Sequence, residues 1–258
     1  MAYFIGLLAV IVGGLLWRYW QQKQRDAQPL PSTYPQLLQE HVDYYRALSD
    51  DRKAVFEERV NYFLHHVQIE GVDTTVDDVD KVLVASSAII PIFGFDDWYY
   101  PLTDVLLYND RFNTDYQTTG NDRNILGMVG EGGALQSTMV LSKPALHDGF
   151  DNKTSKENTG IHEFVHLLDK ADGATDGLPE YLLDKNHSKP WLQLIHRSIR
   201  DIKANHSDIN PYGITNEAEF FAVVAEYFFK RPDLLHEKHP DLFALLEEIF
   251  RQHPLKEV

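Results

Sequence analysis

The sequence contains no cysteine in its 258 residues. This absence excludes disulfide bonds, thiolate nucleophiles and thiolate metal ligands, so any metal ion must be bound by histidine, aspartate or glutamate. It also fits a reducing compartment. No G-x-S-x-G segment occurs either. A Ser-His-Asp hydrolase of the nucleophile-elbow type therefore has no support in the sequence.

Basic residues are few: 24 lysines and arginines stand against 39 aspartates and glutamates, for a formal net charge of −15. Because nucleic-acid binding relies on clustered basic side chains, we expect no nucleic-acid partner. Hydrophobic residues make up 43% and charged residues 24% of the chain, as in folded globular proteins. The length suits one domain with an appendage.

The first 20 residues form a long apolar stretch, with no charge from Met1 to Trp17. Twenty helical residues span about 30 Å, the thickness of the hydrocarbon core of a membrane. A signal peptide has a basic segment before the apolar run and a small-residue cleavage site after it, and both are missing here. We expect residues 1–20 to form a retained transmembrane helix; the alternative is a helix docked on the soluble body.

The positive charges near this stretch all follow it, at Arg18, Lys23 and Arg25. The positive-inside rule then places the C-terminal side of the helix in the cytoplasm. We therefore expect a single-pass protein of the inner (cytoplasmic) membrane, bound to the membrane through this helix, with its folded part in the cytoplasm.

After a polar, proline-bearing linker at 21–33, residues 34–258 are expected to fold as one domain. Its N-terminal part, 34–95, is expected to be helical. Apolar residues at helical spacing predict two antiparallel helices, the second capped near Ser49 and Asp50.

A third helix is predicted for 76–95, broken by Pro91. The part at 96–258 begins with two short apolar runs, 104–108 and 137–142, which read as strands. The glycines of 127–135 suit a tight connection between them. Helical patterns dominate from Asn158 onward. The predicted fold class is α+β, mostly helical, with one small sheet.

The segment "HEFVH" places His162 and His166 four residues apart, on one face of a helix, where both imidazoles can reach one metal ion. Glu163 follows the first histidine, where it can act as the general base of a zinc metalloprotease. A chance HExxH in a structural helix is the alternative. Substrates of such enzymes are expected along a strand edge, and the strand predicted at 137–142 lies just before this helix.

A catalytic zinc site needs a third protein ligand, and with no cysteine this must be a histidine or a carboxylate. The strongly apolar segment 212–230 contains three glutamates. Glu219 and Glu226 are seven residues apart and share one helix face, whereas Glu217 can point outward near the helix start. The first two remain as candidate ligands on this reasoning.

The segments "HEFVHLLDKADGATDGLP" and "PYGITNEAEFFAVVAEYFF" resemble the Mlc titration factor A family of bacterial zinc-dependent peptidases. The resemblance implies a zincin-like fold, similar to the protease domain of anthrax lethal factor, and a gluzincin site. It implies that Zn²⁺ is held by His162, His166 and Glu219. Glu226 is then a group that orients a ligand histidine, and the phenol of Tyr212 assists the oxyanion or the leaving group.

The sequence therefore favours a membrane-anchored zinc metallopeptidase that cleaves a peptide or protein substrate. Two alternatives stay open. One is a zincin-fold interaction protein that sequesters a partner such as a transcriptional repressor, as the name of the resembled family suggests. The other is a helix bundle without metal. Whether Asp169 orients a ligand histidine or only lies near a helix end also stays open.

Overall fold

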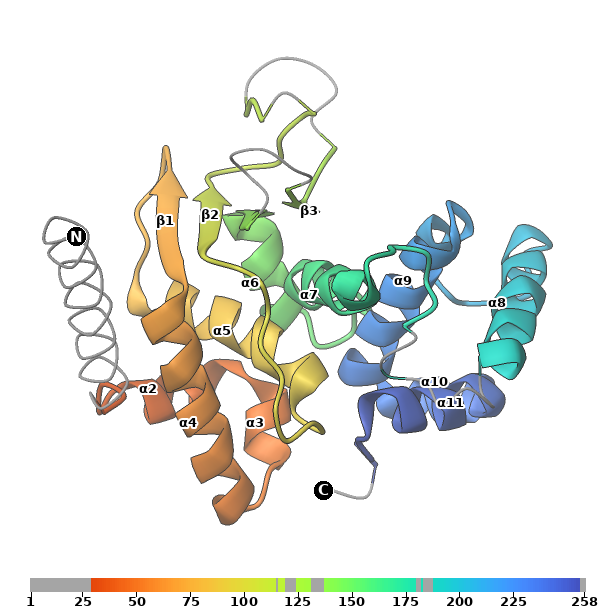
Figure 1. Cartoon of the computed structure of the whole chain (residues 1–258), viewed down its shortest axis with the longest axis horizontal. Helices are drawn as coiled ribbons and strands as arrows, with labels where there is room; N and C mark the ends of the chain where they lie inside the picture. Colours follow the sequence, from red (N-terminus) through yellow and green to blue (C-terminus); the bar gives the residue numbers. More distant parts are fainter. Residues whose placement is uncertain are drawn as a thin grey trace, which may run out of the picture.

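The computed structural model describes residues 29–114, 116–118, 124–130, 137–179, 182 and 188–255. Figure 1 shows a small sheet with helices packed beside and below it. The expected transmembrane helix at 1–20 and most of the linker lie outside the described residues. Among those described, no helix is both long and apolar enough to cross a membrane.

Three helices, rather than the expected two, open the described chain: α2 (Tyr34–His41), α3 (Asp43–Ala47) and α4 (Asp50–His66). The extended backbone of Val42, at φ −115° and ψ 99°, separates α2 from α3. Ser49 lies at the N-cap of α4 as predicted, although its side chain makes no capping hydrogen bond.

Helix α5 (Asp78–Ile92) is the predicted apolar helix, and twelve of its residues are buried. It begins with a capping box, in which the Asp77 side chain accepts from Asp80 N and the Asp80 side chain accepts from Asp77 N. Pro91 lies inside its last turn, and the helix ends one residue later. The break expected at this proline is therefore the C-terminus of the helix.

In the part of the chain that the structure describes, the sheet has four strands in the order β1-β2-β4-β3. Strands β1 (Gln68–Val72), β2 (Asp104–Tyr108) and β4 (Thr138–Ser142) are parallel, and β3 (Gly127–Val129) pairs antiparallel with β4. Two of these strands, β2 and β4, were predicted. β3 lies within the glycine-rich segment expected to be only a connection. The strand predicted as the substrate edge, β4, instead lies inside the sheet, because β3 covers its other side.

Side chains alternate between the two faces of this sheet, as strand geometry requires. Val105, Leu107, Met139 and Leu141 join the main hydrophobic core between the sheet and the helices. The neighbouring positions face a second, smaller cluster, built around Phe112. The helices and the site described below lie on the main-core side.

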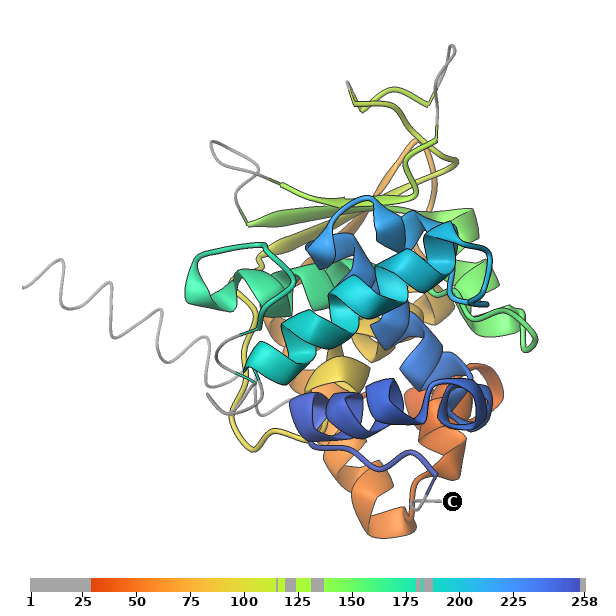
Figure 2. The same cartoon turned by 90° about the vertical axis from the view of Figure 1, so that its right-hand side faces the viewer.

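The described residues after the sheet form eight helical segments: α6 (Lys143–Asp151), α7 (Thr159–Asp169), the short 3₁₀ turn η2 (Lys170–Asp172), α8 (Ser188–Lys203), the 3₁₀ turn η3 (Pro211–Ile214), α9 (Glu217–Lys230), α10 (Pro232–Lys238) and α11 (Pro240–Phe250). Figure 2 shows them below the sheet.

Helix α7 packs between α5 and α9. Its approach to α5 requires Gly160, because a β-carbon there would lie 2.2 Å from Ser87 Oγ. The fold is α+β and mostly helical, as predicted.

Candidate metal centre

Helix α7 carries the HExxH segment and is fixed by an N-cap and by buried apolar side chains. Its N-cap is Asn158, whose side chain accepts from Ile161 N at 3.0 Å. The apolar residues Phe164, Val165 and Leu168 are buried in the core. The histidines His162 and His166 therefore leave the helix on its remaining side, toward α9 and β3.

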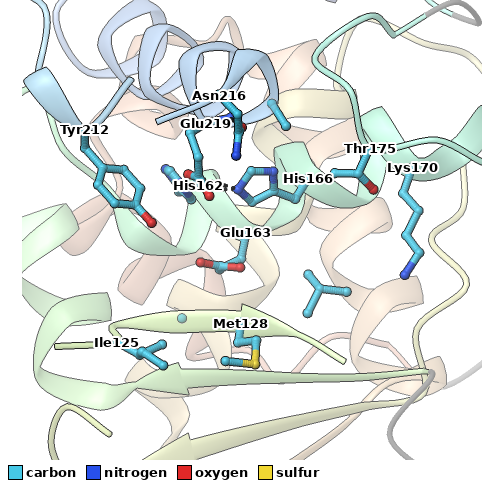
Figure 3. Close-up of a pocket in the computed structure, with 13 residues that line it drawn as sticks. Ile125, Met128, His162, Glu163, His166, Lys170, Thr175, Tyr212, Asn216 and Glu219 are labelled. Atoms are coloured by element: carbon cyan, nitrogen blue, oxygen red, sulfur yellow. Dashed lines mark hydrogen bonds and ion pairs between the residues drawn. The ribbon is translucent and has the colours of Figure 1, made fainter. Parts of the chain in front are cut away.

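The structure brings together the three residues that the resemblance implied as ligands (Figure 3). His162 Nε2 lies 3.1 Å from His166 Nε2 and 3.0 Å from Glu219 Oε2. His166 Nε2 lies 3.5 Å from the same carboxylate oxygen. Glu219 is placed by the start of α9, where the Asn216 side chain accepts from Glu219 N at 2.8 Å. Two helices distant in sequence thus meet at one point.

The donor set fits a cation. His162 Nδ1 donates to Glu226 Oε1 at 2.7 Å, so in the neutral ring Nε2 carries a lone pair. That lone pair faces a carboxylate oxygen and a second imidazole nitrogen. Atoms whose lone pairs face one another repel unless a proton or a metal ion lies between them. Two imidazoles and one carboxylate are one of the ligand sets found in catalytic zinc sites.

The charges in this cluster are strongly coupled. Burial by itself lowers the pKa of His162, but the carboxylates of Glu226 and Glu219 outweigh it and raise that pKa well above its ordinary value. Burial by itself raises the pKa of Glu219, yet hydrogen bonds from His162 and His166 bring it down to about 2. Glu219 is therefore an anion across the physiological range, ready to neutralise a cation.

Glu226, the other candidate from α9, lies behind the cluster and outside the donor set. It is 6% exposed, and its second oxygen accepts the backbone N–H of Asn158, the N-cap of α7. One carboxylate thus fixes both the His162 ring and the start of the helix that carries it. This contact matches the orienting role that the resemblance implied.

Glu163 points from α7 toward the sheet and is 7% exposed (Figure 3). Burial raises its pKa above the ordinary glutamate value. The carboxylate lies against Gly127 of β3, where a β-carbon would be 2.6 Å from Glu163 Oε1. Sequence reasoning missed Gly127, since the segment's glycines suggested only a turn.

Tyr212 lies at the rim of the cluster, in η3. Its ring centre is 6.1 Å from that of His162, and its side chain is 54% exposed. Partial burial, together with the nearby carboxylates of Glu219 and Glu163, raises the pKa of Tyr212, so the phenol stays protonated at neutral pH. It can therefore donate a hydrogen bond to an oxygen in the cleft.

A cleft runs between these residues and β3, with a volume of about 420 Å³ on the side of His166 and about 370 Å³ on the side of Glu226. The two parts meet at His162, Glu163 and Tyr212. Strand β3 is at the edge of the sheet in the described part of the chain, and its residues Gly127, Met128 and Val129 line this cleft.

Asp169, whose role was open, is buried at the end of α7 and accepts from Gly177 N at 2.8 Å. Burial raises its pKa to about 6. Its Oδ1 and the Nδ1 of His166 are both buried without a hydrogen-bond partner among the described residues. The carboxylate therefore anchors the segment after α7, and it makes no hydrogen bond to His166 among the described residues.

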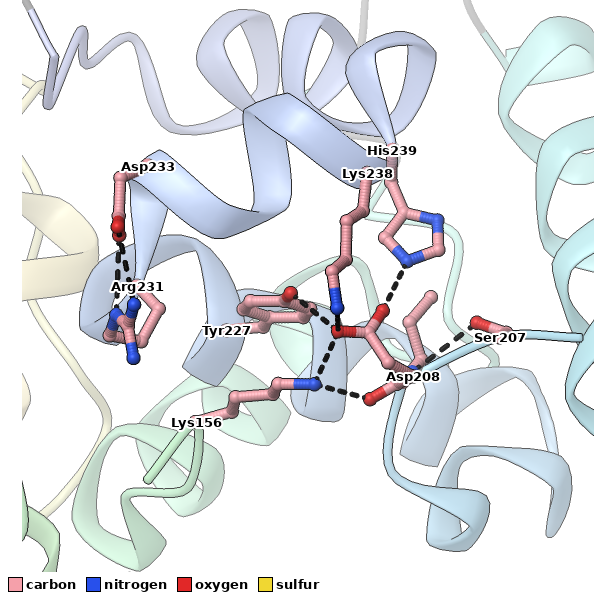
Figure 4. A network of polar contacts seen from close by, with 9 residues as sticks. Lys156, Ser207, Asp208, Tyr227, Arg231, Asp233, Lys238 and His239 are labelled. Carbon is pink, nitrogen blue, oxygen red and sulfur yellow. Dashed lines mark hydrogen bonds and ion pairs between the residues drawn. The ribbon is translucent and has the colours of Figure 1, made fainter. Parts of the chain in front are cut away.

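A separate polar network holds the loop that leads to Tyr212 (Figure 4). Asp208 accepts hydrogen bonds from four side chains: Lys156 at 2.6 Å, His239 at 2.8 Å, Tyr227 at 2.9 Å and Lys238 at 3.0 Å. Burial raises its pKa, but these donors outweigh that effect and hold it well below the ordinary value. The network ties this loop to α9, α10 and the segment before α7.

Comparison with known proteins decides the family. The model of the family described as glucose-regulated metallo-peptidase M90 matches residues 17–251. The chain belongs to this family. An uncharacterised protein of Synechocystis is 28% identical over 97% of this chain and 95% of its own length. Mlc titration factor A of Pectobacterium atrosepticum is 32% identical over 59% of this chain and 60% of its own length. The Salmonella arizonae protein of the same name is 27% identical over 73% and 77%.

Proposed function

We propose that this M90 protein is a zinc-dependent peptidase whose site is formed by α7, the start of α9 and β3. The observation that carries the proposal is the convergence of His162, His166 and Glu219 on one point, with Glu163 buried beside them. Two helices that only packed against each other would have no reason to bring one buried and three partly buried titratable groups so close together. Family membership supports the same reading, since the family is described as metallo-peptidases.

His162, His166 and Glu219 would hold the zinc, while Glu226 keeps the His162 ring in place. When bound, the ion would supply a Lewis acid that polarises the scissile carbonyl and lowers the pKa of water, so that the water can lose a proton and attack.

The chain's own groups perform the remaining steps. The outer edge of β3 binds the substrate backbone as an added strand. Glu163 takes a proton from the attacking water and later delivers it to the leaving amine, and its raised pKa suits this exchange. The Tyr212 hydroxyl donates to the oxygen on which negative charge develops.

The test is hydrolysis of a mixed peptide pool by the full-length protein, followed by mass spectrometry. We expect cleavage that a chelator abolishes and stoichiometric zinc restores, together with about one zinc per chain. Hydrolysis that persists after all metal is removed would contradict the proposal.

A second candidate is sequestration of a transcriptional repressor, which the name of the relatives, Mlc titration factor A, suggests for them. For this chain the function would need only a binding surface. Pull-down of a repressor by a catalytically inactive variant, without any cleavage by the wild type, would favour it. The buried Glu163 supports the peptidase instead, because binding alone requires no general base.

We further propose that residues 1–20 anchor the protein in the cytoplasmic membrane and that the domain at 34–258 lies in the cytoplasm. The support is the uncharged run that ends at Trp17 and the three basic residues that follow it. A reporter fused after Val258 should be active in the cytoplasm. Activity only in the periplasm would overturn this topology.

A further inference from the structure

The two halves of the cleft differ in charge. The half beyond His166 is lined by Met128, Val129, Thr175 and Lys170. The half on the other side, near Tyr212, is lined by Glu157 with Asn210, whose amide donates to Glu157 at 2.6 Å. Figure 3 shows Lys170 on one side of the metal-binding cluster and Tyr212 on the other.

Lys170 is the only lysine or arginine among the described residues that line either half. It is exposed and begins η2, directly after α7. Within the described chain its ammonium group has no hydrogen bond or ion pair. The lysines elsewhere in the structure that form ion pairs, such as Lys143 with Asp80, stabilise the fold, whereas Lys170 is left available to a ligand.

The direction of β3 tells which part of a substrate each half receives. The strand runs from Gly127 to Val129, beginning beside the half with Glu157 and ending beside the half with Lys170. Antiparallel pairing is the more stable arrangement for an added strand. A peptide bound in that way has its N-terminal part near Val129 and Lys170 and its C-terminal part beyond Gly127, toward Glu157. The added strand ends at Gly127, because the backbone of Ile125 is already paired with Phe112.

We propose that Lys170 is a specificity residue that selects substrates with an aspartate or glutamate on the N-terminal side of the scissile bond. The inference rests on the proposed peptidase function and on antiparallel pairing with β3. Glu157 adds to the discrimination, since it repels a carboxylate in the other half of the cleft. Because the chain has a net charge of −15, an acidic substrate requires a local attraction, and Lys170, which forms no ion pair with the described residues, supplies it in the cleft.

The experiment measures kcat/KM of the zinc-loaded, full-length protein on quenched fluorescent peptides. The peptides share one cleavable sequence and carry Glu, Gln or Lys at single positions on either side of the bond. Wild type is compared with Lys170→Ala and Lys170→Glu. Lys203→Glu, at the exposed end of α8 and outside the lining of the cleft, is the matched control for net charge. Zinc content confirms that each variant keeps its site.

We expect wild type to prefer Glu over Gln by about threefold to fivefold at one position N-terminal to the bond, the scale of an exposed ion pair. Lys170→Ala should remove this preference and leave the neutral peptide unaffected within about twofold. Lys170→Glu should reverse it in favour of Lys, and Lys203→Glu should retain the wild-type pattern.

Three results would overturn the inference while the peptidase function stands: cleavage with no acidic preference, a preference that Lys170→Glu does not change, or a preference only on the C-terminal side. Absence of cleavage of every peptide by zinc-loaded wild type would instead contradict the peptidase function, and the inference with it.

Discussion

Gly127 of β3 lies so close to Glu163 of α7 that a β-carbon at position 127 would be 2.5 Å from Glu163 Cγ. Strand β3 and the proposed general base can therefore approach each other this closely only because residue 127 has no side chain. This contact links substrate binding to catalysis, because β3 would bind the substrate backbone and Glu163 would act at the scissile peptide bond.

Replacement of Gly127 by alanine should displace the Glu163 carboxylate without touching the three proposed ligands. We expect Gly127→Ala to retain zinc and to cleave peptides about 100-fold more slowly, the usual cost of displacing a reacting group by about 1 Å. Metal analysis and kcat measured on the same preparation check both parts. Gly213→Ala is the control, since its β-carbon would make only ordinary contacts, at 3.4 Å or more. Equal rates for the two variants would contradict the account.

Glu226 should act on metal affinity through His162. Its Oε1 accepts from His162 Nδ1 at 2.7 Å, so Glu226→Gln weakens the contact that holds the ring. We expect the zinc dissociation constant to rise by about 10-fold to 100-fold, measured by competition with a chromophoric chelator. Glu217→Gln, on the exposed start of the same helix, should leave the constant unchanged. An unaltered affinity in Glu226→Gln would show that the ring needs no such support.

Asp208 should stabilise the fold in a pH-dependent way. Loss of its charge in Asp208→Asn leaves Lys156 and Lys238 without their anion, and we expect the free energy of unfolding to fall by about 2–3 kcal/mol. Because the folded-state pKa lies below the unfolded value of about 3.9, this contribution is present above pH 4 and is lost as the pH falls further.

Urea unfolding at several pH values measures this contribution of Asp208. Asp233→Asn serves as the control, since the Asp233 side chain is 64% exposed in its ion pair with Arg231 and should contribute little. Equal stability of wild type and Asp208→Asn at neutral pH would contradict the assignment.

The sequence was sufficient for the parts of the site that depend on local geometry. The spacing of His162 and His166 fixes their common helix face, and apolar periodicity predicts the buried helices α5 and α7. The choice of Glu219 over Glu226 came from the family resemblance. Both lie on the inner side of α9, and only the structure shows one at the Nε2 atoms and the other at Nδ1.

The parts that could not be predicted depend on pairing across long distances in the chain. β1 and β3 are short, and the glycines around β3 suggested a turn, so the order β1-β2-β4-β3 had no local signal. For the same reason the substrate edge was assigned to the wrong strand. The close contact of Gly127 with Glu163 and the four donors around Asp208 likewise arise only once the chain has folded.

The central claim is that Glu163 acts on the substrate while Glu219 binds the metal, and one paired measurement tests it. Zinc content and peptide hydrolysis are determined together for wild type, Glu163→Gln and Glu219→Ala. We expect Glu163→Gln to retain about one zinc per chain and to lose hydrolysis by about 10²-fold to 10⁴-fold, the scale of a general base. Glu219→Ala should lose zinc and hydrolysis together. Cleavage by Glu163→Gln at the wild-type rate would contradict the peptidase mechanism.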